Sequence, residues 1–211
     1  MKNIKFIYSK IILLSGLLFL ATTSCEREIS SDIVFATNSK AGEIFTESPI
    51  GLGSNFYLPF NGSKATAWTV DINEGYESEA SMRFDVPNAD DPEGNYAGAI
   101  FRIDGAGRNL TEYDALTFWA KASQGVSIGE MGFGLDFEQS KYQVGQTGIN
   151  LSTNWVKYVI PIPDPSKLIE ERGMFWYSAG TQGTGGFGYT FWIDDLQFEK
   201  LGTLGQPKPA I

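Results

Sequence analysis

Residues 189–198 read YTFWIDDLQF, and this stretch decides the fold class. Aromatic and aliphatic side chains alternate along it up to Ile193, which is the period of a β-strand with one buried face. The alternation resumes one residue late, at Leu196, so its phase slips at Asp194 and Asp195. A β-bulge accommodates an extra residue in this way and re-aims the side chains around it. The stretch therefore predicts a bulged strand.

The same period-two pattern recurs along the chain from about residue 55. The runs are short and rich in aromatic and β-branched residues, and turn-rich segments separate them, among them the glycine-rich 180–188 (GTQGTGGFG). Several short strands with turns between them favour an all-β fold, a β-sandwich of two sheets, in which 165–172 is the only helix-like segment. The other expected strands are 65–72, 80–86, 97–104, 115–122, 131–138, 155–162 and 173–178.

Alternation also assigns each side chain of an expected strand to a face. In 115–122, Phe118 faces the core, whereas Trp119 and Lys121 face outward. In 131–138 (MGFGLDFE) the outward positions begin with two glycines, and a strand face without side chains lets a ligand or another backbone approach closely. The inward set of that strand is Met131, Phe133, Leu135 and Phe137, and the outward set is Gly132, Gly134, Asp136 and Glu138.

The first 25 residues have the organisation of an export signal. Three lysines precede the apolar run 11–20 (IILLSGLLFL), and small residues follow up to Cys25, the only cysteine. The run is too short to span a bilayer, which needs about 20 apolar residues. The segment resembles a bacterial lipoprotein signal, and that resemblance implies acylation of Cys25, for example with palmitate, and an anchor in the outer membrane. The alternative is an ordinary signal peptide with an incidental Cys25.

This organisation divides the chain into four segments. The start of the second, 26–28 (ERE), resembles the acidic stretch after the lipidated cysteine in surface lipoproteins of Bacteroidetes-type bacteria. A single domain is expected, because about 190 residues remain after cleavage. The segments are a signal peptide over 1–24, the lipidated cysteine and a polar tether over 25–50, the β-sandwich domain over 51–200, and a Gly- and Pro-containing tail over 201–211.

Composition excludes several classes of function. Cleavage takes three lysines from the 16 basic residues and none of the 25 acidic ones, so the formal charge falls from −9 to −12. Nucleic acid is excluded as a partner, because its binding depends on cationic contacts to phosphate. The chain has no histidine, which removes the commonest general base and the usual zinc ligands. Any catalysis would have to rest on carboxylates, lysine, arginine or tyrosine.

Two adjacent carboxylates at a bulge repel each other unless something compensates for their charge. A bound cation is one compensator, and Ca²⁺ suits hard oxygen ligands. The sequence therefore offers Asp194 and Asp195 as ligands of a structural calcium ion, with Glu79 as a third ligand. The alternative is that both aspartates are solvated at a strand edge.

Three of the expected strands together resemble a known family. They are 114–122 (DALTFWAKA), 153–162 (TNWVKYVIPI) and 191–198 (FWIDDLQF), and they resemble the galactose-binding-like β-jelly-roll of carbohydrate-binding modules. The resemblance covers about 55–200, and it implies a jelly-roll sandwich that binds a polysaccharide or oligosaccharide. It also implies a structural Ca²⁺ near the closing Asp-bearing strand. Because one fold hosts many functions, the site must be argued from particular residues.

Sugar binding requires flat apolar rings for the C–H faces and planar polar groups for the hydroxyls. Rings of the inward set, such as Trp155, Phe118 and Phe191, are expected in the core. For Arg102, the alternative role is a cross-strand ion pair with Asp85 or Asp104. The candidate sugar-binding residues, in turns or on outward faces, are Trp176, Tyr177, Trp68, Arg102, Trp119 and Tyr142.

An enzymatic interpretation rests on three carboxylates, Glu130, Asp136 and Glu138, which resemble the acidic strand of retaining jelly-roll β-glucanases. The nucleophile of that pattern would stand two residues before the aspartate, where this chain has Gly134. We therefore expect a non-catalytic surface lipoprotein that holds glycan near an outer-membrane uptake system. The alternative is an accessory subunit that packs on a TonB-dependent transporter through its exposed aromatic residues and binds no sugar.

Overall fold

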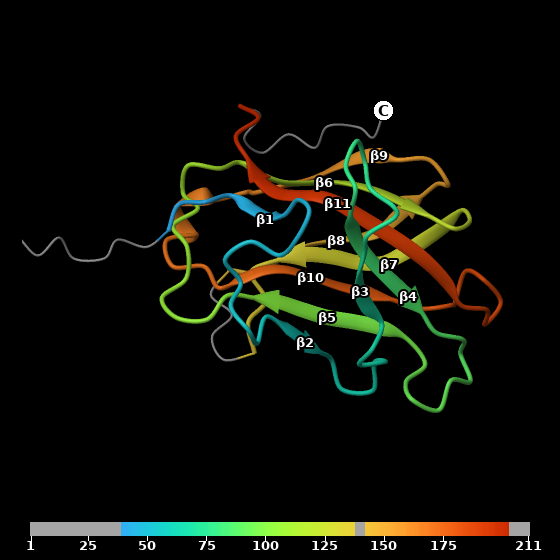
Figure 1. The fold of residues 1–211 in the computed structure, drawn as a ribbon. Coiled ribbons are helices and arrows are strands. Elements are labelled where there is room, and N and C mark those ends of the chain that lie inside the picture. The colour runs from blue at the N-terminus through green and yellow to red at the C-terminus, as the bar shows by residue number, and fades with distance from the viewer. Residues whose placement is uncertain (1–38, 138–141, 203–211) are drawn as a thin grey trace, which may run out of the picture. The chain divides into compact units, whose positions relative to one another are not determined.

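A computed structural model describes residues 39–137 and 142–202, which form two antiparallel sheets packed face to face (Figure 1). The six-stranded sheet has the order β3-β4-β11-β6-β9, with β1 paired to β11, and the five-stranded sheet has the order β2-β5-β10-β7-β8. The six-stranded sheet consists of β1 (Glu43–Phe45), β3 (Trp68–Asp71), β4 (Ser81–Val86), β6 (Ala115–Ala122), β9 (Val156–Pro161) and β11 (Tyr189–Glu199). The five-stranded sheet consists of β2 (Tyr57–Pro59), β5 (Ala97–Arg102), β7 (Val126–Phe133), β8 (Val144–Leu151) and β10 (Gly173–Ala179).

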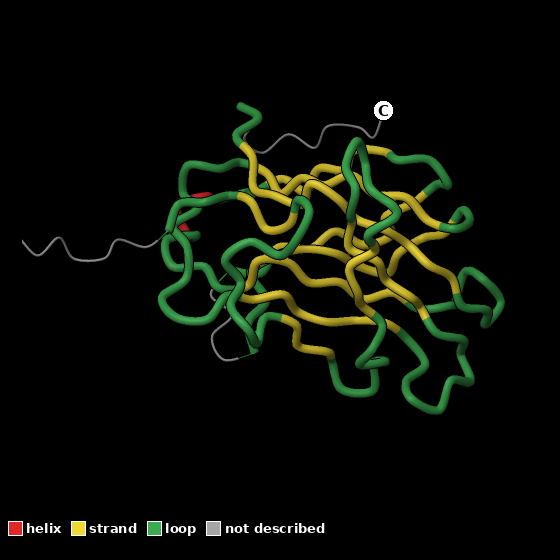
Figure 2. The backbone as a smooth tube through the Cα atoms, in the orientation of Figure 1, coloured by secondary structure: helices red, strands yellow, loops and turns green. Residues whose placement is uncertain are grey.

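The predicted two-sheet sandwich is confirmed. Strands cross the middle of the domain and loops gather at its two ends (Figure 2), while the expected helix is a single 3-10 turn, η1, over Pro165–Lys167. No helix in the described ranges is long and apolar enough to cross a membrane.

Aromatic rings from both sheets fill the core between them. Phe84 and Phe191 are cross-strand neighbours on β4 and β11, and their rings stack with centroids 4.5 Å apart. From the opposite sheet, the ring of Tyr177 meets Phe84 edge to face at 4.6 Å, and Phe101 lies beside it. Such edge-to-face and stacked pairs add specific attraction to the burial of their area. The alternating aromatic residues therefore explain why the two sheets pack together.

The bulge in β11 lies at the predicted position. The register between β11 and β6 shifts between Asp194 and Gln197, and Asp195 has a positive φ of 47°. Aspartate is among the residues that adopt this left-handed conformation with little strain. Beyond the bulge the inward alternation resumes at Leu196 and Phe198, both of which are buried.

The expected strand 131–138 is misplaced. β7 ends at Phe133, and the chain turns at Gly134, which has a φ of 79°. Alternation therefore stops there: Phe137, expected inside, is 57% exposed, and Asp136, expected outside, is buried. Glu138 lies outside the described residues.

Both ends of the described chain are attached at the same end of the sandwich. The buried Arg108 donates hydrogen bonds to the carbonyl oxygens of Ala41, Glu43 and Ile50. The buried Asp114 accepts hydrogen bonds from the backbone amides of Leu201 and Gly202, each at 2.6 Å. Because β1 and these contacts precede residue 51, the folded unit begins earlier than the expected boundary between tether and domain.

Candidate functional site

An open cavity of about 660 Å³ lies at the end of the sandwich opposite to the two attached chain ends. Its wall is made by the glycine-rich loop between β10 and β11 and by the loop that precedes β5 (right side of Figure 1). Small residues dominate this wall, so the backbone is close to the open space. The lining residues that carry polar side chains are Asn95, Tyr96, Ser178, Thr181 and Gln182.

A row of side chains continues from this cavity across the outer face of the five-stranded sheet. The backbone amide of Phe60 donates a hydrogen bond to the carbonyl oxygen of Gly98. Gly98 of β5 is the cross-strand neighbour of Ser178 of β10, and Ser178 is in turn the cross-strand neighbour of Glu130 of β7. A methyl group at Gly98 would come within 2.9 Å of the Phe60 ring and 3.0 Å of the Tyr96 ring. The rings of Phe60 and Tyr96 therefore lie over Gly98, which is buried, and the hydroxyl of Ser178 and the carboxylate of Glu130 follow on the next two strands. We use the word trough as a name for this row of Phe60, Tyr96, Ser178 and Glu130.

Aromatic rings line one edge of this trough. Phe60 contacts Phe137 edge to face at 5.8 Å, and Tyr96 donates a hydrogen bond from its hydroxyl to the carbonyl oxygen of Asn61 at 2.9 Å. That hydrogen bond holds the Tyr96 ring in place beside Gly98. The edge thus presents fixed, partly exposed rings next to polar groups, which is the combination that a sugar ring requires.

Glu130 is the charged member of the row. It is half-buried, and within the described part of the chain its carboxylate forms neither an ion pair nor a hydrogen bond. The next residue towards the cavity, Gly129, contributes to the cavity wall. An ionised carboxylate accepts hydrogen bonds only, so Glu130 is available to hydroxyl or ammonium donors of a ligand.

Trp176 lies on the outer face of the same sheet, as expected, but its ring is covered. It is 3% exposed, and its ring lies over Gly132 of β7 and Gly145 of β8, where added methyl groups would come within 2.9 Å and 2.7 Å of the ring. The indole N–H donates to the carbonyl oxygen of Phe133 at 3.3 Å. Gly132 of β7 and Gly145 of β8 therefore accommodate the ring of Trp176, and the expectation that this ring is exposed is wrong.

Two other candidates belong to the core. Tyr177 alternates with Trp176 and points between the sheets, where it is fully buried and its pKa is raised well above the usual value by burial. Trp68 packs against Phe56, Tyr57 and Phe101, with ring centroids 5.3–5.4 Å from it. The expectation that these two rings face outward is wrong, because each shares the inward phase of its strand.

The remaining candidates are already engaged and lie apart from the cavity. Trp119, on the outer face of β6, is stacked under Tyr76 at 3.6 Å between centroids. Arg102 pairs with Asp136 at 3.1 Å, in place of either ion pair considered from the sequence. The hydroxyl of Tyr142 accepts a hydrogen bond from the amide of Asp164, beside η1. The structure therefore brings none of these three to the trough.

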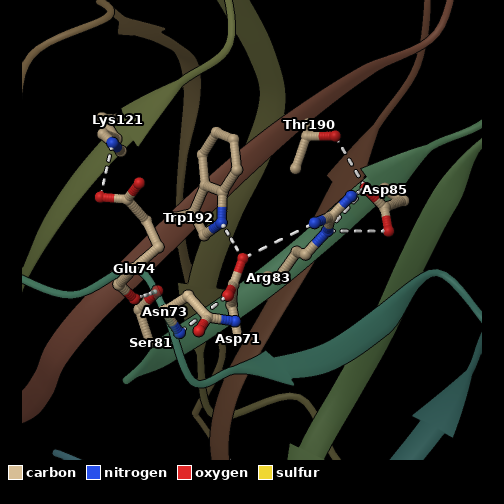
Figure 3. A network of polar contacts seen from close by, with 9 residues as sticks. All are labelled: Asp71, Asn73, Glu74, Ser81, Arg83, Asp85, Lys121, Thr190 and Trp192. Atoms are coloured by element: carbon tan, nitrogen blue, oxygen red, sulfur yellow. Dashed lines mark hydrogen bonds and ion pairs between the residues drawn. The ribbon is translucent and has the colours of Figure 1, made fainter. Parts of the chain in front are cut away.

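A second polar surface covers the outer face of the six-stranded sheet (Figure 3). At its centre, Trp192 donates its indole N–H to Asp71 at 3.0 Å, and this hydrogen bond is the main reason that the pKa of Asp71 is lowered. The cations of Arg83 and Lys121, from the strands on either side, lie 5.9 Å and 5.2 Å from the Trp192 ring centroid. Lys121 also pairs with Glu74 at 2.7 Å. The polar groups of this surface contact one another, so fewer of them are available to hydrogen-bond a sugar than in the trough.

The bulge aspartates hold a loop by hydrogen bonds. One oxygen of the buried Asp194 accepts from the amide of Tyr76 at 2.8 Å and from the hydroxyl of Ser78 at 2.6 Å, and the other accepts from the amide of Asp195 at 2.7 Å. Burial raises the pKa of Asp194 and of Asp195. A calcium ion takes about six to eight oxygen ligands, whereas the described residues contain no group of three acidic side chains arranged for a metal, and Glu79 is exposed. The residues around the bulge do not fit a calcium site.

Replacing Asp194 with alanine is expected to lower the free energy of unfolding by about 2 kcal/mol, because the donors of Tyr76 and Ser78 lose their acceptor. Asp195→Asn should change it by less than about 0.5 kcal/mol, since asparagine tolerates a positive φ. Urea denaturation measures both. If the melting temperature of the wild type fell on addition of a chelator, that result would contradict this explanation and would indicate a calcium ion at the bulge.

A two-sheet β-sandwich with a cavity at one end and aromatic rings beside it is the arrangement of a ligand-binding domain. The chain belongs to the carbohydrate-binding domain 30 family, whose model matches residues 43–200, and it is a non-catalytic carbohydrate-binding module. Two crystal structures of family 30 carbohydrate-binding modules are similar in fold. The first has a TM-score of 0.51 and 18% identity, and the match covers 80% of this chain and 91% of that structure. The second has a TM-score of 0.54 and 17% identity, and the match covers 75% of this chain and 98% of that structure.

A third similar structure is the family 30 module of a cellulosomal cellulase of Clostridium thermocellum. It has a TM-score of 0.50 and 17% identity and covers 76% of this chain and 98% of its own. No curated protein matches the sequence.

Sequence reasoning missed the residues of the trough. Phe60 and Tyr96 stand just outside strands, where period-two alternation assigns no face, and Ser178 is a common polar residue with no distinguishing pattern. Glu130 was considered only as a member of a catalytic pattern. The available signal was Gly98 in an otherwise apolar strand, because an interior glycine often marks a place where another group approaches closely.

Proposed function

We propose that the protein is a surface lipoprotein that binds carbohydrate in the cavity and the trough that continues from it. The observation that carries the proposal is that partly exposed rings, a hydroxyl and a carboxylate that no described residue engages lie side by side, in the row Phe60, Tyr96, Ser178 and Glu130. A sugar ring that enters the trough can place its C–H face against Phe60 and Tyr96 and its hydroxyls against Ser178 and Glu130.

The dimensions of the site agree with a saccharide ligand. The cavity of about 660 Å³ falls within the range of roughly 300–1,000 Å³ that small-molecule sites occupy. Tyr96 and Ser178 belong both to the cavity wall and to the trough, so a chain of several sugar rings can contact the two together. The polar lining groups Asn95 and Gln182 offer amides, which both donate and accept hydrogen bonds and suit vicinal hydroxyls.

Binding to a glycan array tests this function. The soluble protein from residue 39 onward should bind a defined subset of oligosaccharides, and plant cell-wall β-glucans belong in the panel because one similar structure is a module of a cellulosomal cellulase. Affinity gel electrophoresis with soluble polysaccharides provides an independent readout. The proposal would be rejected if no polysaccharide retarded the protein in a gel and no array spot bound it.

The location at the membrane rests on residues outside the described part of the chain. The lysines, the apolar run 11–20 and Cys25 support export and acylation. The described chain begins at the end of the sandwich that is farther from the cavity. An anchor attached through the N-terminus would therefore be joined to the domain at the end that is farther from the cavity.

Replacing Cys25 with alanine is expected to abolish membrane retention, because the residue that would carry the acyl chains is lost. Fractionation of cells grown with labelled palmitate measures both retention and acylation. Replacing Ser24 with alanine keeps a small residue before the cysteine and should leave both unchanged. Palmitate-labelled Cys25→Ala protein in the membrane fraction would contradict the lipoprotein proposal.

A further inference from the structure

Thr181 differs from the other residues of the cavity wall because its side chain is buried. It is 5% exposed, whereas every other described residue that lines the cavity is at least partly exposed. Its hydroxyl forms no hydrogen bond with any described residue, yet the hydroxyl oxygen is not completely covered. Buried polar groups of proteins are nearly always hydrogen-bonded. Because Thr181 lines the cavity, its hydroxyl is a buried hydrogen-bonding group that a ligand in the cavity can reach.

The backbone of Thr181, in contrast, is held firmly. Its carbonyl oxygen accepts hydrogen bonds from the amides of Thr184 and Gly186, each at 3.1 Å, and from the hydroxyl of Thr184 at 3.2 Å. The hydroxyl of Tyr189 donates to the carbonyl oxygen of the preceding residue, Gly180, at 3.2 Å. A binding group that is fixed before the ligand arrives loses little conformational entropy on binding. The loop therefore holds the Thr181 hydroxyl in a defined position.

Three further polar groups of the cavity wall form no hydrogen bond with the described part of the chain. They are the hydroxyl of Ser178 and the side-chain amides of Gln182 and Asn95. Gln182 follows Thr181 directly, and its amide lies over Gly180, where an added methyl group would come within 2.5 Å of the amide oxygen. Asn95 belongs to the other loop of the wall, the one that precedes β5. Hydrogen-bonding groups from both loops and from β10 are therefore available in the cavity.

The chemistry of these groups indicates which ligand they suit. A hydroxyl and a carboxamide each donate and accept hydrogen bonds, and neither carries a charge. No charged side chain is among the described residues that line the cavity. A sugar hydroxyl also donates and accepts, and the adjacent hydroxyls of a pyranose ring present several such groups within a short distance. The wall therefore matches an uncharged sugar residue whose adjacent hydroxyls are free.

We propose that Thr181 is the specificity-determining residue of the carbohydrate site: its hydroxyl hydrogen-bonds one hydroxyl of a neutral sugar residue, and the amides of Gln182 and Asn95 bind the adjacent hydroxyls. The inference rests on the proposed carbohydrate site and adds the class of sugar that it takes and the residue that recognises it. A site built to hydrogen-bond a ligand hydroxyl discriminates strongly against an analogue that lacks it, because the buried polar group of the protein is then left unpaired.

The test measures the affinity of the protein for four neutral hexasaccharides by isothermal titration calorimetry: cellohexaose, mannohexaose, xylohexaose and maltohexaose. Thr181→Val removes the hydroxyl and keeps the branched shape of the side chain, so we expect about tenfold weaker binding of the sugar that the wild type binds best. Thr181→Ser keeps the hydroxyl and should stay within about threefold of the wild type. The matched control is Thr69→Val, which makes the same change at an exposed position of the opposite sheet and should leave the affinity unchanged.

Thermal denaturation checks that the three variants keep the fold, so that a loss of affinity reports the missing hydroxyl. Equal affinities of the wild type and Thr181→Val, or a loss in Thr181→Ser as large as that in Thr181→Val, would overturn the role of Thr181 and leave the proposed function intact. If none of the four hexasaccharides bound while the array identified a charged glycan, the neutral class would be wrong and the proposed function would stand. If neither the hexasaccharides nor any array glycan bound, the proposed function would be rejected, and this inference with it.

Discussion

Replacing Trp176 with alanine is expected to lower the free energy of unfolding by about 3–5 kcal/mol, as for other buried large-to-small aromatic changes. The ring is 3% exposed and lies on Gly132 and Gly145, so its removal leaves a cavity on the face of three adjacent strands. The indole hydrogen bond to the carbonyl oxygen of Phe133 is lost as well. For a domain of this size the change corresponds to a fall in melting temperature of roughly 10 °C.

The control for this variant is Trp192→Ala, on the outer face of the opposite sheet. Trp192 is only partly buried, so we expect a smaller loss, about 1 kcal/mol, from its contacts with Asp71, Arg83 and Lys121. Thermal denaturation followed by circular dichroism measures both variants. A Trp176→Ala protein that melts like the wild type but no longer binds glycan would show that the ring contacts sugar instead of supporting the sheet.

Replacing Phe60 and Tyr96 together with alanine is expected to weaken glycan binding about 100-fold, which is about 2.7 kcal/mol. Aromatic anchors at the centre of a binding site commonly contribute about 2 kcal/mol or more each. Both rings border Gly98, and both are only partly buried, so the fold should survive their loss. Calorimetric titration with the tightest oligosaccharide from the array measures the affinity, and circular dichroism checks the fold.

Trp192→Ala is again the matched control, because it removes a partly exposed ring from the opposite sheet. It should leave the affinity within about twofold of the wild type. The reverse pattern, with affinity lost in Trp192→Ala and kept in the double variant, would move the site to the outer face of the six-stranded sheet. There Arg83 lies by the ring, and Asp85 accepts hydrogen bonds from Arg83 and Thr190.

The two-sheet sandwich could be predicted from the sequence because strands such as β6 and the first half of β11 alternate regularly. Residues 115–122 were expected as a strand and form β6 with the same bounds, and the phase slip at Asp194 and Asp195 is the observed bulge. β8 escaped prediction because its sequence, VGQTGINL, is mostly polar and exposed along one edge of the sheet. β1 and β2 have three residues each, too few for a period to be recognised.

The site was harder to predict than the fold, because alternation assigns a face but not what covers that face. Trp176 was placed on the correct side of β10, yet only the structure shows that two glycines of neighbouring strands receive its ring. Trp119 was likewise placed outward, where Tyr76, more than 40 residues away in the chain, stacks on it. Such contacts depend on register between strands and on loop paths, which single-strand patterns do not contain.

The most direct test of the carbohydrate site is a map of amide chemical-shift changes in the protein on titration with its tightest-binding oligosaccharide. We expect the largest changes to cluster at Tyr96, Gly98, Glu130, Ser178 and Gln182, around the cavity and the trough. Amides of the outer face of the six-stranded sheet should stay at their free positions. Changes centred on Arg83 and Trp192, with the trough unaffected, would contradict the account.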